Sequence, residues 1–363
     1  MEIPPDAWQQ GPWNRWSYQH VDEVVSVDAV ANDPARTRAW LLAAAELDDL
    51  VDPFVASAWV DGVLVAHRGA IVCERYANAM APQTLHISQS VGKSVLGLVV
   101  GVLLGRAVLG REDLATTYVP EVTGSGYDGA TIGHLLDMTA GVDFVEDYAD
   151  LWRYDAACGW HPPARGVPET ILAYLPTIGP ADWSHGERFH YASPNTDLLG
   201  LIAERAAGRR LSEVISAELW APLGAERGAL LTVDGGGTAV ISGGLCACLR
   251  DYARLGQLVA DGGAGIVPGP FVDSLGGGSA EACYATTSDA EARAGTTGYA
   301  DQWWCLDGRP TARGIHGQLI TVHRASGVVI TVLSSQPEAL DPRLARLQRG
   351  FADAVHARLV AER

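Results

Sequence analysis

The sequence has almost no lysine. Lys93 is the only lysine among 26 Lys and Arg residues, so the other 25 are arginines. The 43 Asp and Glu residues outnumber these basic residues and give a formal net charge of −17. Surfaces that bind nucleic acid need an excess of basic side chains, which this composition does not supply. We therefore expect a small-molecule partner and no nucleic acid.

Long hydrophobic runs and metal-type cysteine pairs are missing as well. The longest apolar run, 94–104, is too short for a bilayer, which takes about 20 residues, so we expect no membrane association. The first residues show no basic and apolar leader pattern, which predicts a cytoplasmic location. The six cysteines include no CxxC pair. We expect free thiols and neither a metal nor another cofactor.

The single lysine stands in the first turn of an apolar segment. Small and apolar residues follow Ser90 to Leu104, a composition that predicts a fully buried helix. Ser90 and Lys93 are three residues apart, so they share one helix face. The helix N-terminus disfavours a protonated lysine and favours a serine alkoxide, and lysine can lose its proton where arginine cannot. This S-x-x-K pattern predicts Ser90 as nucleophile and Lys93 as its base, with chance survival of one lysine as the alternative.

Two further segments could complete such a site. Tyr191 precedes a helix that we expect to begin at Ser193-Pro194, with Ser193 as its N-cap. A tyrosine held there could pass the proton to a leaving group, although core packing is the default role of a buried tyrosine.

Near the C-terminus, the segments 302–306 and 318–323 are predicted strands, and Gly314-Ile315-His316-Gly317 lies between them. Glycines here allow close backbone approach to a ligand, and the Ile315 amide is the predicted oxyanion donor beside that of Ser90. His316 could contact substrate or pack at the strand end.

These elements, in this order, resemble the β-lactamase-related serine hydrolases, above all the 6-aminohexanoate-dimer hydrolases and the family VIII-type carboxylesterases. The likeness also includes Ser242-Gly243-Gly244-Leu245 and the predicted helix at 250–256, and it spans nearly the whole chain. Its other markers are the segments 13–16, 146–148, 191–197, 302–305 and 314–318.

The resemblance implies that Ser90 is the nucleophile, Lys93 the base and Tyr191 the proton shuttle. It also implies that Tyr148 closes over a substrate amide and that Asp155 lies near a substrate amine. A half-exposed loop aromatic and a solvated loop charge are the alternatives for these two residues. The further predicted substrate-binding residues are Ser242, Gly314, His316 and Trp304.

Two differences from the families that the chain resembles narrow the range of expected substrates. Ser242 stands where relatives active on nylon oligomers carry Asn or His before Gly-Gly. Penicillin-recognising members have a Lys-Thr-Gly strand whose cation holds a carboxylate, whereas this chain has Ala312-Arg313-Gly314 and no second lysine. Both departures argue against nylon dimers and β-lactams as substrates, and a true β-lactamase or DD-peptidase is therefore less favoured.

The implied fold is α+β. An α/β domain at 1–109 and 234–363 has an antiparallel sheet flanked by helices, including a terminal helix at 341–361. A mainly helical domain spans 110–233, and the active-site cleft lies between the two. The Gly-rich stretches 235–237 and 262–278 are predicted loops.

The predicted function is hydrolysis of a small ester or amide through an acyl-enzyme on Ser90. An acyltransferase using the same acyl-enzyme is the alternative, and a non-catalytic binding protein is less favoured. The oligomeric state is left open, with a homodimer among the options.

Overall fold

The computed structural model describes residues 3–148, 151–275, 277 and 296–361. Its largest element is an eight-stranded sheet in the order β2-β4-β3-β12-β11-β10-β9-β8. Neighbouring strands are antiparallel except β2 and β4. The strands are β2 (Leu41–Leu42), β4 (Ala70–Tyr76), β3 (Val60–His67), β12 (Val328–Ser334), β11 (Gln318–His323), β10 (Arg309–Gly314), β9 (Trp303–Leu306) and β8 (Gly298–Ala300).

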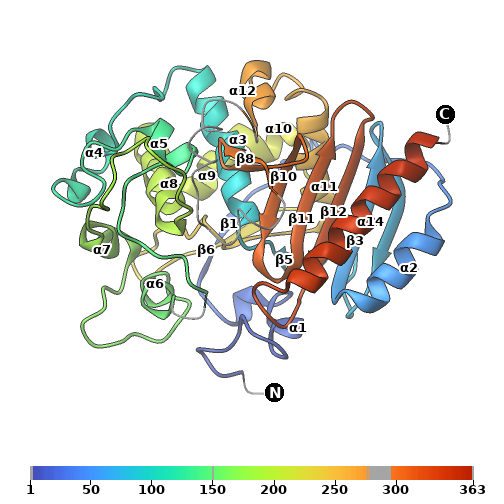
Figure 1. Cartoon of the computed structure of the whole chain (residues 1–363), viewed down its shortest axis with the longest axis horizontal. Coiled ribbons are helices and arrows are strands. Elements are labelled where there is room, and N and C mark those ends of the chain that lie inside the picture. The colour runs from blue at the N-terminus through green and yellow to red at the C-terminus, as the bar shows by residue number, and fades with distance from the viewer. Residues whose placement is uncertain (1–2, 149–150, 276, 278–295, 362–363) are drawn as a thin grey trace.

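Helices cover both faces of this sheet, and for that reason its central strands are apolar and buried on both sides (Figure 1). On one face lie α2 (Asp48–Ser57) and α14 (Pro342–Ala361), joined by stacking of Phe54 on Phe351 at 4.0 Å between ring centroids. On the other face lie α3 (Val91–Gly105) and α11 (Leu249–Ala260). The fold class implied by the sequence is confirmed.

The region 110–233 lies to one side of the large sheet, and its regular secondary structure is mainly helical (Figure 1). Its α-helices are α4 (Ala115–Tyr118), α5 (Ile132–Leu136), α6 (Trp152–Ala157), α7 (Ile171–Tyr174), α8 (Ser193–Ala207), α9 (Leu211–Ile215) and α10 (Ala221–Leu223). It ends in β6 (Ala229–Thr232), part of a four-stranded sheet with β1 (Val27–Val30), β7 (Leu245–Ala247) and β5 (His86–Ile87). The domain boundaries proposed from the sequence stay a prediction.

Helix α3 is the buried helix predicted after Ser90, with residues 91–103 all buried. Close packing at its first turn requires a glycine. A Cβ on Gly92 would lie 2.5 Å from the carbonyl oxygen of Ile241, closer than carbon and oxygen can approach. The absence of a side chain at Gly92 therefore lets the start of α3 pack directly against the backbone of residues 241–242.

Two sequence-based expectations are wrong in detail. Ser193 is the first residue of α8 rather than its N-cap, which is Ala192, and the Ser193 hydroxyl makes no cap hydrogen bond because it is bonded to Glu146. The stretch 262–278 is not only loop, since it contains α12 (Gly269–Ser274). Residues 276 and 278 of that stretch lie outside the described residues.

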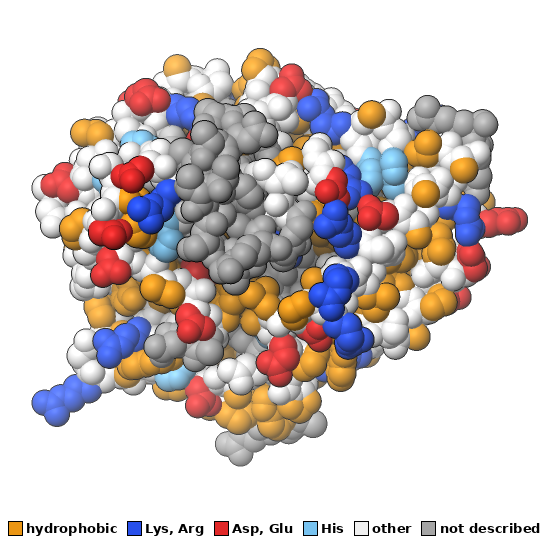
Figure 2. Space-filling view, in the orientation of Figure 1, with side chains coloured by type: hydrophobic (Ala, Val, Ile, Leu, Met, Phe, Trp, Pro, Cys, Tyr) orange, Lys and Arg blue, Asp and Glu red, His pale blue; other side chains and the backbone are white. Residues whose placement is uncertain are grey.

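The expectation of free cysteines is confirmed for Cys73, Cys158, Cys246, Cys248 and Cys305. Cys283 lies outside the described residues. Within the described ranges, no helix is both long and apolar enough to cross a membrane. On the face shown in Figure 2, basic side chains lie beside acidic ones. Ion pairs of the chain include Arg309–Asp353 and Arg349–Asp307.

Candidate active site

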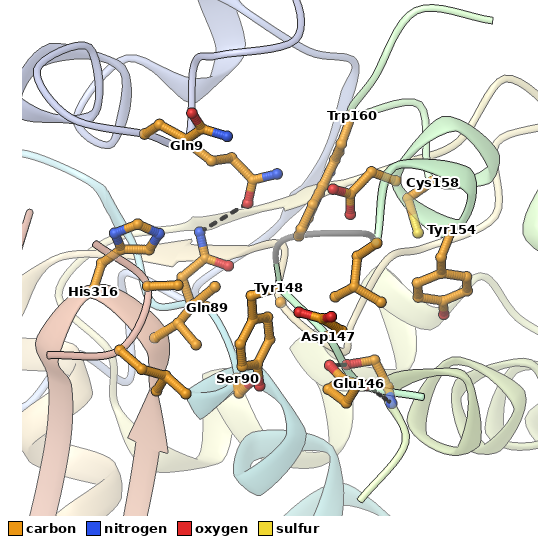
Figure 3. A pocket seen from close by; sticks show the side chains of 18 of the residues that line it. Gln9, Gln89, Ser90, Glu146, Asp147, Tyr148, Tyr154, Cys158, Trp160 and His316 are labelled. Carbon is orange, nitrogen blue, oxygen red and sulfur yellow. Dashed lines mark hydrogen bonds between the residues drawn. The ribbon is translucent and has the colours of Figure 1, made fainter. Parts of the chain in front are cut away.

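Ser90 lies at the N-terminal end of α3 and lines a cavity of about 830 Å³. Distant parts of the chain build this cavity: residues 6–11, the loop 145–148, α6 with the residues after it, and the segments 242–243, 315–316 and 337–340. Ser90 and the neighbouring acidic loop are drawn in Figure 3. The predicted nucleophile therefore has a place where a substrate can reach it.

Lys93 is buried beneath Ser90, with 1% of its surface exposed. Its Nζ lies 2.9 Å from Ser90 Oγ, 3.0 Å from Ser193 Oγ and 2.7 Å from the carbonyl oxygen of Ser242. The last contact depends on the close packing at Gly92. The structure therefore brings the predicted serine and lysine into direct hydrogen-bond contact.

The residue before Ser90 has an unusual backbone. Gln89 has a φ of +49°, in the left-handed region that non-glycine residues rarely adopt. Its side chain is buried and its Nε2 donates to Tyr18 Oη at 3.0 Å and to Gln9 Oε1 at 3.3 Å, the latter drawn in Figure 3. These contacts hold the turn that presents Ser90 to the cavity.

Glu146 contacts Ser193 with both carboxylate oxygens. Oε1 accepts from Ser193 Oγ at 2.6 Å, and Oε2 accepts from the Ser193 backbone amide at 2.8 Å. Burial raises the pKa of Glu146, and the positive charge of Lys93 opposes that shift. Glu146 is thus linked to Lys93 through one hydroxyl group.

Asp197, on α8, fixes the Ser242 segment from the other side. It accepts hydrogen bonds from the Ser242 amide at 2.8 Å, from the Ser242 hydroxyl at 2.7 Å and from the Tyr154 hydroxyl. Burial raises the pKa of Asp197, and these donors lower it. Ser242 therefore lines the cavity, as expected of a substrate-binding residue, but its hydroxyl is directed to Asp197 and its carbonyl oxygen to Lys93.

Tyr191 lies beside Lys93, whose Nζ is 5.1 Å from the centroid of the phenol ring. The ring is buried and stacks on Trp304 at 5.2 Å between centroids, in a cluster with Phe189 and Tyr299. Trp304 thus packs against Tyr191 and lies outside the set of described residues that line the cavity. This placement favours support of the Tyr191 ring over the substrate contact that we expected of Trp304.

Close packing also brings the end of β10 to the cavity. A Cβ on Gly314 would lie 2.4 Å from the carbonyl oxygen of Ser88, so the close approach that this glycine permits is to protein backbone rather than to a ligand. The next residues, Ile315 and His316, line the cavity. His316 is 3% exposed and its Nδ1 contacts the carbonyl oxygen of Gln336, while burial lowers its pKa to about 4.

The cavity wall that faces these groups is acidic. Tyr148 and Asp155 both line the cavity, together with Asp6, Glu146, Asp147 and Glu338. Burial, followed by the charge of Glu146, raises the pKa of Asp155 to about 7. No arginine or lysine is found among the described residues that line the cavity.

A family model for beta-lactamases matches residues 47–353, most of the chain. The chain belongs to the beta-lactamase family. Across this family the relatives found are named as hydrolases, esterases and beta-lactamases, and the chain is a β-lactamase-related serine hydrolase.

Two relatives in sequence and one solved structure are similar to this beta-lactamase-family protein. It is 36% identical to a 6-aminohexanoate-dimer hydrolase of Paenarthrobacter ureafaciens, over 92% of this chain and 88% of that protein. It is 27% identical to esterase EstB of Burkholderia gladioli, over 50% of each protein. A solved structure from Bacillus anthracis, provisionally named as a 6-aminohexanoate-dimer hydrolase, shares the fold with a TM-score of 0.85 and 24% identity, over 98% of this chain and 96% of that one.

Sequence reasoning missed several residues around the site. Glu146 was noted only as part of a family-like segment, and Asp197 and Gln89 were given no role. Each acts on a residue distant in sequence, such as Ser193, 47 residues after Glu146, and no local spacing signals such a contact. Within the described ranges, no group of three or more His, Cys, Asp or Glu residues is placed to hold a metal ion.

Proposed function

We propose that this protein hydrolyses a small ester or amide through an acyl-enzyme on Ser90. Lys93 takes the Ser90 proton as Oγ attacks the carbonyl carbon, and Tyr191 passes this proton from Lys93 to the leaving group as the carbonyl carbon loses that group. The amides of Ser90 and Ile315 stabilise the oxyanion, a contribution typically worth about 3 kcal/mol per donor. Water then releases the acid and restores Ser90.

One observation carries this proposal. The only lysine of the chain is buried with its Nζ 2.9 Å from the hydroxyl of a serine that lines the cavity of about 830 Å³. A buried lysine held at hydrogen-bond distance from an accessible serine is the arrangement by which an amine activates a hydroxyl nucleophile.

The acidic cavity wall favours a substrate that carries an ammonium group. Asp155 and four other acidic residues line the cavity, and no arginine or lysine is found among its described lining residues. Such a wall attracts a positive group and repels the carboxylate of a penicillin. An ester or amide of an amino acid with a free amine therefore fits better than a β-lactam. The relative that hydrolyses 6-aminohexanoate dimers has a name consistent with this class.

The test is a panel of p-nitrophenyl esters, small amides and a chromogenic β-lactam, applied to the wild type and to Ser90→Ala, Lys93→Arg and Tyr191→Phe. We expect wild-type turnover of esters and amides, strongest with amine-bearing ones, and none with Ser90→Ala. Lys93→Arg keeps the charge but cannot act as a base, so acylation should be abolished. Tyr191→Phe should lower turnover by about a hundredfold or more.

Intact-mass measurement after a fluorophosphonate probe gives the covalent readout. The wild type should gain one adduct, located at Ser90 by peptide mapping. Full activity of Lys93→Arg, or labelling elsewhere than Ser90, would refute the assignment. Added amines or alcohols separate hydrolysis from acyl transfer, because the latter yields new amides or esters rather than only the free acid.

A further inference from the structure

The Ser193 hydroxyl has only one proton, and the structure directs it to Glu146. Oε2 of Glu146 accepts from the Ser193 backbone amide, and Oε1 lies 2.6 Å from Ser193 Oγ. In its ionised form, which the charge of Lys93 favours, Glu146 only accepts hydrogen bonds, so the Ser193 hydroxyl then donates to it. Towards Lys93, 3.0 Å away, Ser193 Oγ can then act only as an acceptor.

This direction matters when Lys93 is unprotonated. A neutral amine has two N–H groups and one lone pair. The carbonyl oxygen of Ser242 accepts one N–H, and Ser193 Oγ accepts the other. The Ser90 hydroxyl can donate to the lone pair, whereas the Ser242 carbonyl oxygen and Ser193 Oγ cannot.

We propose that Glu146 is a positioning residue that acts through Ser193, setting the hydrogen-bond direction at Lys93 so that the amine lone pair faces the Ser90 proton. This inference rests on the proposed function, in which Ser90 is the nucleophile and Lys93 the base. The proton moves from Ser90 Oγ to Lys93 Nζ as Oγ bonds to the carbonyl carbon. Glu146 and Ser193 neither gain nor lose a proton.

The charges around Lys93 also influence its pKa, which can be followed separately through the pH dependence of kcat/KM. The groups that face Lys93 are Glu146 on the loop before α6, Asp197 on α8 and the Tyr191 phenol before α8. Burial raises the pKa of both carboxyl groups, and the charge of Lys93 lowers it. The interaction is mutual, so each carboxylate favours the ammonium form of Lys93.

The variant Glu146→Gln tests both effects. Its amide oxygen would face the Ser193 amide, because two N–H donors cannot face each other. The amide nitrogen would then donate to Ser193 Oγ and release the Ser193 proton, which competes with Ser90 for the Lys93 lone pair. Loss of the carboxylate charge also makes Lys93 easier to deprotonate.

The experiment measures the burst rate of p-nitrophenol release against pH in the wild type, Glu146→Gln, Ser193→Ala and the double variant. We expect Glu146→Gln to lower the maximal acylation rate by about tenfold or more. We also expect the acid limb of kcat/KM to move to lower pH. In the Ser193→Ala background, Glu146→Gln should change the maximal rate by less than about twofold, because the group through which it acts is gone.

Glu187→Gln is the matched control. Glu187 also accepts a hydrogen bond from a serine backbone amide, that of Ser184 at 2.9 Å, but it is exposed. It should keep the wild-type rate and pH profile. Near-ultraviolet circular dichroism and thermal melting check that each variant is folded.

The proposal would be overturned if Glu146→Gln lowered the maximal acylation rate equally in the wild-type and Ser193→Ala backgrounds. It would also be overturned if the acid limb of kcat/KM did not move. If Glu146→Gln does not fold, Glu146→Asp replaces it. This variant keeps the charge and the accepting oxygens, so its acid limb should stay at the wild-type pH, and a shifted limb would contradict the role. An active Lys93→Arg or Ser90→Ala enzyme would instead refute the proposed function itself.

Discussion

At the scale of single residues, chemistry that depends on one side-chain type could be predicted from the sequence. Lys93 stood out because arginine replaces lysine everywhere else in the chain. The role of Ser193 could not be predicted in this way. A serine before a proline is typical of an N-cap, and only the carboxylate of Glu146, brought in by the fold, turns its hydroxyl toward Lys93.

Asp155 supplies a pH-dependent prediction at this scale. With a pKa of about 7, this carboxyl group is neutral below that pH and ionised above it. For an ester that carries an ammonium group, kcat/KM should therefore rise as the pH passes through about 7, because the negative charge appears. The ratio of kcat/KM for the ammonium ester to that for an uncharged ester of equal length isolates this effect from the titration of Lys93.

Asp155→Asn is the variant that checks the assignment. In this variant, the ratio of kcat/KM for the ammonium ester to kcat/KM for the uncharged ester should not change between acidic and neutral pH. A ratio that still rises in this variant would mean that another group senses the substrate charge.

At the scale of secondary-structure elements, apolar patterns predicted the buried helix after Ser90 and the strands near the C-terminus, and the family resemblance implied the terminal helix. They could not predict how closely these elements approach one another. The contact of α3 with residues 241–242 and that of β10 with Ser88 are set by missing side chains at Gly92 and Gly314. A sequence displays these glycines without showing which backbone they will meet.

Gly92→Ala tests the importance of the contact at α3. The added Cβ would meet the Ile241 carbonyl oxygen at 2.5 Å, so the helix must move away from Ser242. We expect a loss of about 1–3 kcal/mol in the free energy of unfolding and slower labelling of Ser90 by a fluorophosphonate.

Gly350→Ala is the matched control, since Gly350 lies within α14 and a Cβ there meets no atom within 4 Å. It should leave labelling unchanged and stabilise the protein by up to about 1 kcal/mol. Similar stability and labelling rates for Gly92→Ala and Gly350→Ala would show that the close contact of α3 with Ile241 does not control the reactivity of Ser90.

At the scale of the whole molecule, the cavity is assembled from both ends and the middle of the chain. The family model begins at residue 47, yet Gln9, Gln10 and Gly11 form part of the cavity wall. Trp8 anchors this segment, since its indole Nε1 donates to the Trp160 carbonyl oxygen at 2.9 Å, 152 residues away. Contacts over such separations explain why no role in the cavity wall could be predicted from the sequence for Gln9, Gln10 and Gly11.

Trp8→Ala should therefore affect both stability and substrate binding. Trp8 is 1% exposed, so its removal should cost about 3–5 kcal/mol in urea denaturation and raise KM for a p-nitrophenyl ester. Trp16→Ala is the control, since the Trp16 side chain is 41% exposed, and it should change both the stability and KM far less. Equal effects of Trp8→Ala and Trp16→Ala on stability and KM would show that the anchoring of the N-terminal segment by Trp8 does not contribute to the site.

The acidic wall also has a consequence for the end of the reaction. Cleavage of an ester or amide turns a neutral group into a carboxylic acid, which loses its proton to water and becomes an anion. Five carboxylates surround that new anion, and no arginine or lysine is found among the described lining residues to retain it. Electrostatic repulsion between these carboxylates and the new anion weakens binding of the acid product, so inhibition by an accumulated acid that carries no ammonium group should be weak.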